Sequence, residues 1–327
     1  MNIKRNINIK EICDQIKKGN ITALSKAITL SESNIDSDQE LANKILAKLK
    51  TKNNDSIRIG ITGVPGAGKS TFIESFGNHI TNLGLKLAVL TIDPSSSVTK
   101  GSILGDKTRM ETLSANKNVF IRPSPASNFQ GGVGKNTRES IFLCESAGYD
   151  IILIETVGVG QNEISVAEMV DFFLLLKISG SGDELQGIKR GIIEMSDLIA
   201  INKCDGDNVK DSIKAKNEFK LALQLFPKKK SNWEPQVLTC SSLTGEGLAD
   251  IWECITNYVN LTKKNNYFYE NRINQNKSWL LQIIDYSLRK SFFNRKSIKI
   301  KLNNLIKKIE EQKISIFEAS RKILSEI

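Results

Sequence analysis

The segment that decides the fold is "IRIGITGVPGAGKSTF", residues 57–72. Residues 57–62 form an apolar run that predicts a buried strand, and residues 63–70 match the P-loop pattern Gly-x-x-x-x-Gly-Lys-Ser. In a P-loop the glycines let successive backbone N–H groups approach a polyphosphate. The helix that begins there directs its positive end at the same anion. The alternative is an ordinary glycine-rich turn, but the strand before it and the helix after it favour the P-loop.

The pattern assigns a role to each residue type in this loop. The ammonium of Lys69 neutralises the β- and γ-phosphates and also acts in catalysis, and the hydroxyl of Ser70 binds Mg²⁺. We expect the nucleotide to contact Gly63, Gly66, Ala67, Gly68, Lys69, Ser70 and Thr71.

Further apolar runs extend the predicted sheet. They are residues 85–92, 118–123, 149–155, 172–178, 198–202 and 236–241. Nearly all are continuous and rich in Ile, Val and Leu, which is typical of strands buried on both faces of a parallel sheet. The helical segments between them imply right-handed crossovers. The sequence therefore predicts an α/β fold, a doubly wound and mostly parallel sheet of the P-loop NTPase type.

Helical extensions flank this domain on both sides. Ile9, Ile12 and Ile16 share one helical face near the N-terminus, and the strand-like pattern stops after residue 261. We expect an N-terminal helical extension over 1–56, a P-loop domain over 57–261 and a C-terminal helical extension over 262–327.

A second motif, "INKCD" (residues 201–205), selects guanine. The carboxylate of Asp205 accepts hydrogen bonds from the N1–H and the exocyclic amine of guanine, and adenine lacks this pair of donors. The stem of Lys203 would lie on the base, and Asn202 would tie this loop to the P-loop. In "CSSLTGEG" (residues 240–247) the nucleotide contacts would come from Ser241, Ser242 and Leu243. The alternative for 240–247 is a turn that opens a helix, and both can hold together.

The segment "ETVGVGQNE", residues 155–163, ends another predicted strand. A P-loop enzyme needs a carboxylate at the end of a central strand for its Mg²⁺, and Glu155 occupies that position, where a small GTPase carries Asp. Gln161 is a candidate to orient the attacking water, although its spacing differs from that of small GTPases. The alternative is a strand end followed by a glycine-rich turn.

Two further acids are candidate metal ligands. Asp93 follows the predicted strand 85–92, at the carboxyl edge where open α/β sheets bind their ligands. Asp106 and Arg109 lie in the next segment. An Asx-type cap at Asp93 and a surface ion pair between Asp106 and Arg109 are the alternatives, but the neighbouring P-loop favours Mg²⁺ or switch roles.

Composition limits the remaining possibilities. The five cysteines form no Cys-x-x-Cys pair and His79 is the only histidine, so a disulfide framework, a zinc site and His-based catalysis are disfavoured. We see no signal peptide, transit peptide or membrane-length apolar run, and expect a cytoplasmic protein. Residues 262–327 carry 15 Lys or Arg and 6 Asp or Glu, which accounts for most of the net charge of +10. A solvated helical surface explains this better than a nucleic-acid or membrane site.

Taken together, several motifs resemble the methylmalonyl-CoA mutase-associated GTPases, the MeaB/ArgK family. They are "GITGVPGAGKSTFIE", "TIDPSSS", "GSILGDKTRM", "AGYDIILIETVGVGQNE", "SGDELQGIKRGI", "NKCD" and "SSLTGEGL". The resemblance implies a SIMIBI-class P-loop GTPase with a Glu-x-x-Gly switch, bound GTP or GDP, and Mg²⁺. It also implies a homodimer formed partly by the C-terminal helices. Its partner would be a cobalamin-dependent acyl-CoA mutase, whose cofactor loading and protection are gated by GTP. By the same resemblance, residues 180–191 form a further switch loop, with Asp183 and Lys189 as catalytic or relay groups.

The chain departs from the family pattern at two places, Ser179, where a proline is usual, and residues 128–136. No cobalamin motif Asp-x-His-x-x-Gly is present, so the cobalamin would belong to the partner. Two competing functions remain. One is a metal-delivery GTPase of the nickel-insertion type, which would require a His-rich or paired-Cys site, and the other is a transport-linked NTPase or kinase. Asp205 disfavours ATP in that last role. Binding of nucleic acid by the basic C-terminal segment is the remaining, non-enzymatic alternative.

Overall fold

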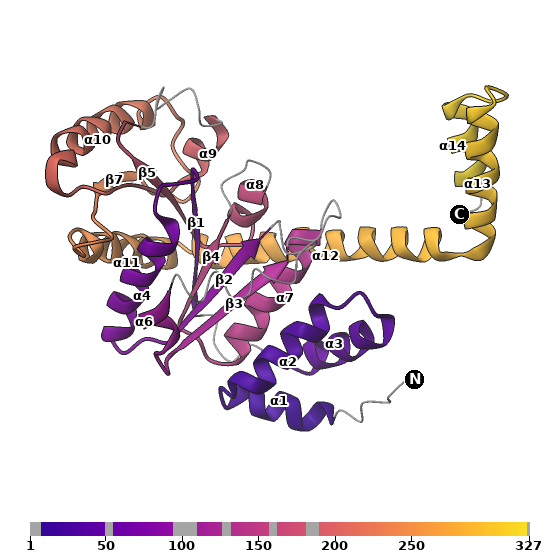
Figure 1. Cartoon of the computed structure of the whole chain (residues 1–327), viewed down its shortest axis with the longest axis horizontal. Helices are drawn as coiled ribbons and strands as arrows, with labels where there is room; N and C mark the ends of the chain where they lie inside the picture. Colours follow the sequence, from indigo (N-terminus) through magenta and orange to yellow (C-terminus); the bar gives the residue numbers. More distant parts are fainter. Residues whose placement is uncertain are drawn as a thin grey trace. The chain divides into compact units, whose positions relative to one another are not determined.

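The described strands form one parallel sheet (Figure 1). The computed structural model describes residues 8–49, 55–93, 110–125, 132–156, 162–180 and 190–325. Within these ranges seven strands pair in the order β3-β2-β4-β1-β5-β6-β7, and every pairing is parallel. They are β1 (Ile57–Gly63), β2 (Leu87–Asp93), β3 (Val119–Pro125), β4 (Ile151–Glu155), β5 (Phe172–Ile178), β6 (Leu198–Asn202) and β7 (Gln236–Thr239). Each predicted strand is present, and the predicted doubly wound α/β fold is confirmed.

Neighbouring residues along the strands enter two different cores, which explains why the strand sequences are continuously apolar. Leu153 of β4 packs into the core on one face of the sheet, and its neighbours Ile152 and Ile154 pack into the core on the other. Since successive side chains of a strand point to opposite faces, a strand covered on both sides needs apolar residues at every position.

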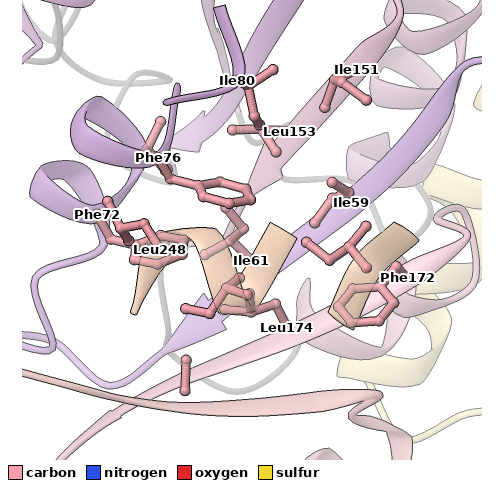
Figure 2. Close-up of a cluster of buried hydrophobic side chains, with 14 of the residues drawn as sticks. Ile59, Ile61, Phe72, Phe76, Ile80, Ile151, Leu153, Phe172, Leu174 and Leu248 are labelled. Atoms are coloured by element: carbon pink, nitrogen blue, oxygen red, sulfur yellow. The ribbon is translucent and has the colours of Figure 1, made fainter. Parts of the chain in front are cut away.

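On one face the sheet is covered by α4 (Lys69–Asn82), α6 (Glu111–Ser114) and α11 (Leu248–Lys264). Figure 2 shows Phe72 and Phe76 of α4 pointing into the apolar layer formed with β1, β4 and β5. Their rings stack with centroids 5.2 Å apart. This packing fixes the helix that follows the P-loop, and so fixes the loop itself.

The other face is covered by α7 (Gly132–Ser146), α8 (Asn162–Ala167) and the N-terminal helices α1 (Ile9–Lys17), α2 (Ile21–Glu32) and α3 (Asp36–Lys48). The predicted apolar face of α1 is buried at Ile12 and Ile16, in the same core as α7 and strands β2 and β4. Arg122 of β3 forms an ion pair with Glu32 of α2. The N-terminal extension is therefore packed against the sheet domain.

A third apolar cluster lies at the β5, β6 and β7 end of the sheet. Here α9 (Arg190–Met195) and α10 (Val209–Leu223) pack on the strands, and the short 3-10 helix η2 (Gly206–Asn208) precedes α10. Phe219 of α10 is fully buried in this cluster.

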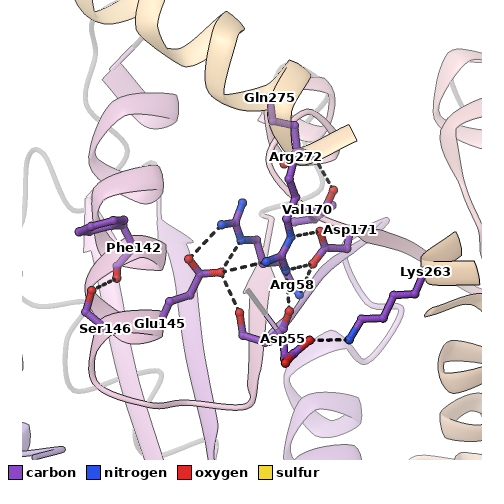
Figure 3. Close-up of polar contacts among 11 residues, drawn as sticks. Asp55, Arg58, Phe142, Glu145, Ser146, Val170, Asp171, Lys263, Arg272 and Gln275 are labelled. Atoms are coloured by element: carbon purple, nitrogen blue, oxygen red, sulfur yellow. Dashed lines mark hydrogen bonds and ion pairs between the residues drawn. The ribbon is translucent and has the colours of Figure 1, made fainter. Parts of the chain in front are cut away.

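The chain forms two compact units, residues 1–275 and 276–327. The boundary that we expected after residue 261 lies inside α11, and the first turns of α12 (Tyr267–Asn294) still belong to the first unit. The first unit extends into α12 because the side chains of Phe268, Arg272 and Gln275 are buried. Figure 3 shows Arg272 next to Asp171, Glu145 and Arg58, and its Nη2 lies 2.6 Å from Asp171 Oδ2.

The second unit contains the rest of α12, α13 (Lys296–Glu310) and α14 (Ile316–Leu324). Its core is small and consists of Ile298, Leu305, Ala319 and Ile323. The side chain of Ser315 accepts a hydrogen bond from the backbone N–H of Glu318, so Ser315 caps the N-terminus of α14.

Among the residues that the structure describes, no helix has both the length and the apolar content that crossing a bilayer requires.

Candidate nucleotide-binding site

The P-loop lies between the end of β1 and the start of α4. Gly68 is the N-cap of α4 and has a φ of 84°. A side chain there would be strained, and a Cβ atom would lie 2.8 Å from Nδ2 of Asn202. Glycine is therefore required at this position both by the backbone and by the neighbouring loop.

Lys69, the first residue of α4, folds back over this loop. Its Nζ donates hydrogen bonds to the carbonyl oxygens of Gly63 at 2.8 Å and Val64 at 3.3 Å. Burial lowers the pKa of Lys69, and the carboxylates of Glu155 and Glu163 act in the opposite direction. The ammonium therefore lies among oxygens, in the position from which a P-loop lysine reaches phosphate.

Asn202, at the end of β6, joins three segments of the site. Its Nδ2 donates to the carbonyl of Ala67 in the P-loop at 2.9 Å. Its Oδ1 accepts from the backbone N–H of Ser242 at 3.0 Å and from the hydroxyl of Ser242 at 2.7 Å. The side chain is almost fully buried. The contact with the P-loop is the one expected from the sequence, and the contacts with Ser242 extend it to the loop 240–247.

Asp205 is held by the same loop. The hydroxyl of Ser241 donates to Oδ2 of Asp205, and the backbone N–H groups of Leu243 and Thr244 lie 3.3 and 3.1 Å from that hydroxyl oxygen. This arrangement orients the carboxylate before any base arrives. A cavity of about 210 Å³ opens beside it, and is lined by Gly68, Thr71, Asn202, Lys203, Asp205, Ser242 and Leu243. Every lining residue is one that the sequence assigned to nucleotide binding.

Of the four predicted metal ligands, the structure describes the side chains of Ser70 and Glu155. Ser70 lies in the first turn of α4, and Glu155 ends β4, paired with Ile61 of β1 and Thr91 of β2. The strand β4 thus brings Glu155 to the edge of the sheet where β1 enters the P-loop. Hydroxyl and carboxylate oxygens are the ligands that Mg²⁺ prefers, so these two residues fit the ion.

The remaining predicted site residues are outside the described part of the chain. Asp106, Gln161, Asp183 and Lys189 lie outside it, and of Asp93 only the backbone at the end of β2 is described. Their roles stay predictions. Among the described residues there is no group of three His, Cys, Asp or Glu side chains that would hold a metal ion.

Comparison with known proteins identifies the family. The model for "Methylmalonyl Co-A mutase-associated GTPase MeaB" matches residues 24–297. The chain belongs to the MeaB family. The predicted family and the GTPase class are thereby confirmed.

Relatives of the MeaB family support this over most of the chain. The GTPase ArgK of Escherichia coli is 44% identical over 83% of this chain and 82% of its own length. The mouse protein named "Methylmalonic aciduria type A homolog, mitochondrial" is 43% identical over 89% of this chain and 73% of its own. The crystal structure of a protein described as "LAO/AO transport system kinase" has a TM-score of 0.76 at 33% identity, and the match covers 98% of both chains.

Sequence reasoning missed several residues that shape this MeaB-family site. Thr156 donates to the hydroxyl of Thr62 at 2.9 Å, which joins the end of β4 to β1. The hydroxyl of Ser75 in α4 donates to the carbonyl of Ser242. Glu163 is buried and acts on Lys69. Thr156 stands in the quoted segment 155–163, but its sequence context indicates no role, and no motif marks Ser75; the partner of each is distant in sequence. Glu163 ends the quoted segment 155–163 and lies in the first turn of α8, so its acidic side chain there was the available signal.

Proposed function

We propose that this protein is a GTPase chaperone of a cobalamin-dependent acyl-CoA mutase of the methylmalonyl-CoA mutase type. GTP binding and hydrolysis gate the loading of cobalamin into that mutase and protect it from inactivation. The observation that carries the proposal is the match of the MeaB family model to residues 24–297. The mouse relative, whose name refers to methylmalonic aciduria, supports the same partner.

The guanine specificity follows from the preformed base site. The carboxylate of Asp205, already oriented by the hydroxyl of Ser241, lies at a cavity that the stem of Lys203 also lines. Guanine presents two donors to such a carboxylate, whereas adenine would leave it unsatisfied. The bond from Asn202 to Ala67 couples this base site to the phosphate loop.

Hydrolysis proceeds by in-line attack of water on the γ-phosphate. Lys69 neutralises charge on the phosphates, and Gln161 orients the water, while Asp183 and Lys189 act as relay or accelerating groups. Ser70, Asp93, Asp106 and Glu155 would hold Mg²⁺, which supplies further charge neutralisation when it is bound. We expect slow turnover by the protein alone and faster turnover in the complex.

The proposal includes a homodimer in the cytosol, where the five cysteines, all free in the structure, stay reduced. The C-terminal part of α12 supports the dimer. Leu280, Ile284 and Leu288 follow one another at intervals of four residues, and their exposed fractions are 57%, 45% and 65%. Such an exposed apolar stripe on a long helix is typical of an interaction surface.

The test is capture of the mutase by the tagged protein in an extract of its own host. We expect a cobalamin-dependent mutase to be recovered, in amounts that differ between GDP and a non-hydrolysable GTP analogue. Light scattering of the free protein measures the dimer. Capture of no mutase, or of equal amounts in every nucleotide state, would contradict the proposal.

The matched control is Asp205→Asn. This variant presents an amide to the base, so it should prefer xanthosine nucleotides over guanosine nucleotides. Capture by the variant should then respond to xanthosine di- and triphosphate and ignore the guanosine forms. A response of the variant to GDP like that of the wild type would show that Asp205 does not select the base.

A transport-linked kinase is the second candidate, favoured by the similarity to the crystal structure of a protein described as a transport system kinase. That function transfers the γ-phosphate to an acceptor other than water. Incubation with γ-labelled GTP, with and without lysine, arginine and ornithine, distinguishes the two. Label in inorganic phosphate alone supports the GTPase, and label in any of the added amino acids supports the kinase.

A further inference from the structure

Lys203, in the guanine loop, has an unusual backbone conformation. Its φ is 60°, in the left-handed region that residues with a side chain rarely occupy. Lys203 and Asp205 both line the cavity of about 210 Å³ beside the P-loop. The backbone conformation at Lys203 therefore determines where its side-chain stem and the carboxylate of Asp205 lie. Because this conformation is unfavourable, other residues must stabilise it.

The side chain of Asn208, at the end of η2, provides that support. Its Nδ2 donates to the carbonyl oxygen of Lys203 at 2.7 Å, and its backbone N–H donates to the carbonyl of Asp205 at 3.1 Å. Asn208 thus closes the turn 203–208 at both of the residues that face the base. It does not itself line the cavity.

Asn208 is in turn held from a neighbouring strand. The hydroxyl of Ser179, directly after β5, donates to Oδ1 of Asn208 at 2.7 Å. The ends of the two strands are adjacent, because Ile178 of β5 pairs with Asn202 of β6. With Oδ1 accepting from Ser179, the amide nitrogen must face Lys203, so the Ser179 hydroxyl selects the orientation of the amide.

We propose that Asn208 is a positioning residue of the guanine site, and that Ser179 orients it. Asn208 holds the left-handed turn at Lys203 and thereby sets the distance from Asp205 to the base. This inference rests on the guanine-binding function proposed above. It adds Asn208 and Ser179 as residues that determine base specificity without touching the base.

The test compares the dissociation constants for GDP and IDP in the wild type and in Asn208→Ala. Hypoxanthine lacks the exocyclic amine, so the ratio of the IDP constant to the GDP constant reports how well Asp205 is placed. We expect Asn208→Ala to weaken GDP binding about tenfold and to lower that ratio by several fold. A general loss of stability would weaken both nucleotides equally and leave the ratio unchanged.

Four further variants make the test specific. Asn217→Ala removes an exposed asparagine from α10, the helix that follows Asn208, and should leave both constants unchanged. Ser179→Ala should weaken GDP binding about threefold, and Ser179→Thr, which keeps the hydroxyl, should restore it. Combining Ser179→Ala with Asn208→Ala should add nothing to Asn208→Ala alone, because Ser179 acts through Asn208.

Two results would overturn the inference. One is an Asn208→Ala variant whose IDP-to-GDP ratio matches the wild type, whether or not GDP binding is weaker. The other is a Ser179→Ala effect that persists undiminished in the Asn208→Ala background. Both require a wild type that binds GDP. A wild type that ignores GDP would instead overturn the proposed function, and this inference with it.

Discussion

At the scale of single residues, burying the ammonium of Lys69 is unfavourable, but it places the charge where a phosphate would bind. Its ammonium is partly buried and donates hydrogen bonds to the carbonyl oxygens of Gly63 and Val64, and burial lowers its pKa. The carboxylates of Glu155 and Glu163 partly offset this effect. A polyphosphate would offset it further, because a bound anion stabilises the protonated form. Binding of the nucleotide and the protonation of Lys69 are therefore linked.

The linkage predicts how GDP affinity depends on pH. Below the lowered pKa, Lys69 is protonated before and after binding, so its contribution is independent of pH. Above that pKa the free protein has lost the proton and must take one up to bind, so affinity falls as pH rises. The fall should begin below the ordinary lysine value of 10.5. Calorimetry from about pH 7 to about pH 10 measures it.

Lys69→Met supplies the control for this measurement. The variant has no amine to titrate, while ionisation of the guanine affects both proteins alike. At neutral pH the variant should bind GDP at least about tenfold more weakly than the wild type. The two affinities should converge as the pH rises, and a constant ratio across the range would contradict the assignment of Lys69.

At the scale of elements, the two helices that begin beside the candidate nucleotide site both start in the same way. Both α4 and α11 start after a left-handed glycine, Gly68 with φ 84° and Gly247 with φ 76°. A Cβ atom at Gly247 would lie 2.3 Å from the carbonyl oxygen of Thr239 in β7. The loop 240–247 can thus return close to its own strand only because Gly247 has no side chain.

The variants Gly247→Ala and Gly245→Ala separate two reasons for glycine in this loop, which are the left-handed backbone and the lack of space for a Cβ atom. Gly245 also has a positive φ, of 82°, but nothing lies within 4 Å of a Cβ built on it. Gly245→Ala should therefore lower the free energy of unfolding by about 1 kcal/mol, the backbone strain alone. Gly247→Ala adds the clash with β7 and should cost more than about 3 kcal/mol. Urea unfolding measures both, and equal losses would contradict this explanation.

At the scale of the whole molecule, Arg272 ties the start of α12 to the sheet (Figure 3). Its Nε donates to Oδ1 of Asp171 at 2.7 Å, and its guanidinium lies over the ring of Phe268. Glu145 of α7 accepts two bonds from Arg58 of β1, at 2.8 and 2.9 Å, and lies 3.8 Å from Arg272. This network joins α12, α7, β1 and the residue before β5. It lies at the strand ends opposite the P-loop.

Breaking this network should lower the free energy of unfolding and leave the affinity for GDP unchanged. Arg272→Ala leaves Asp171 buried without its cation, so we expect a loss of about 3–5 kcal/mol in the free energy of unfolding. Arg289→Ala is the matched control, because Arg289 and Asp285 are exposed at 65% and 66% and such pairs contribute under about 1 kcal/mol. GDP affinity of the folded Arg272→Ala protein should equal that of the wild type. Similar unfolding energies for the two variants would refute the role of Arg272.

Much of the site was evident from the sequence because its chemistry is local. The P-loop glycines, Lys69 and the Asn202, Lys203 and Asp205 group are short motifs, and the strands that carry them are mostly apolar. A strand buried on both faces has few alternatives, so its pattern is visible without knowing its neighbours. The strand ends then bring Glu155 and the P-loop to one edge of the sheet.

Tertiary structure decided what depends on contacts between distant residues. Asn208 meets Ser179 across 29 positions of the chain, and Arg272 meets Asp171 across 101. An asparagine after a turn and an arginine on a helix are common, and no local pattern shows which partner each will find. The limit of the first unit at residue 275 has the same origin, since burial of Phe268 and Arg272 against the sheet, and not their helical sequence, places them there. Only the folded chain brings such partners within hydrogen-bonding distance, because the energy of these contacts depends on geometry that the motifs do not encode.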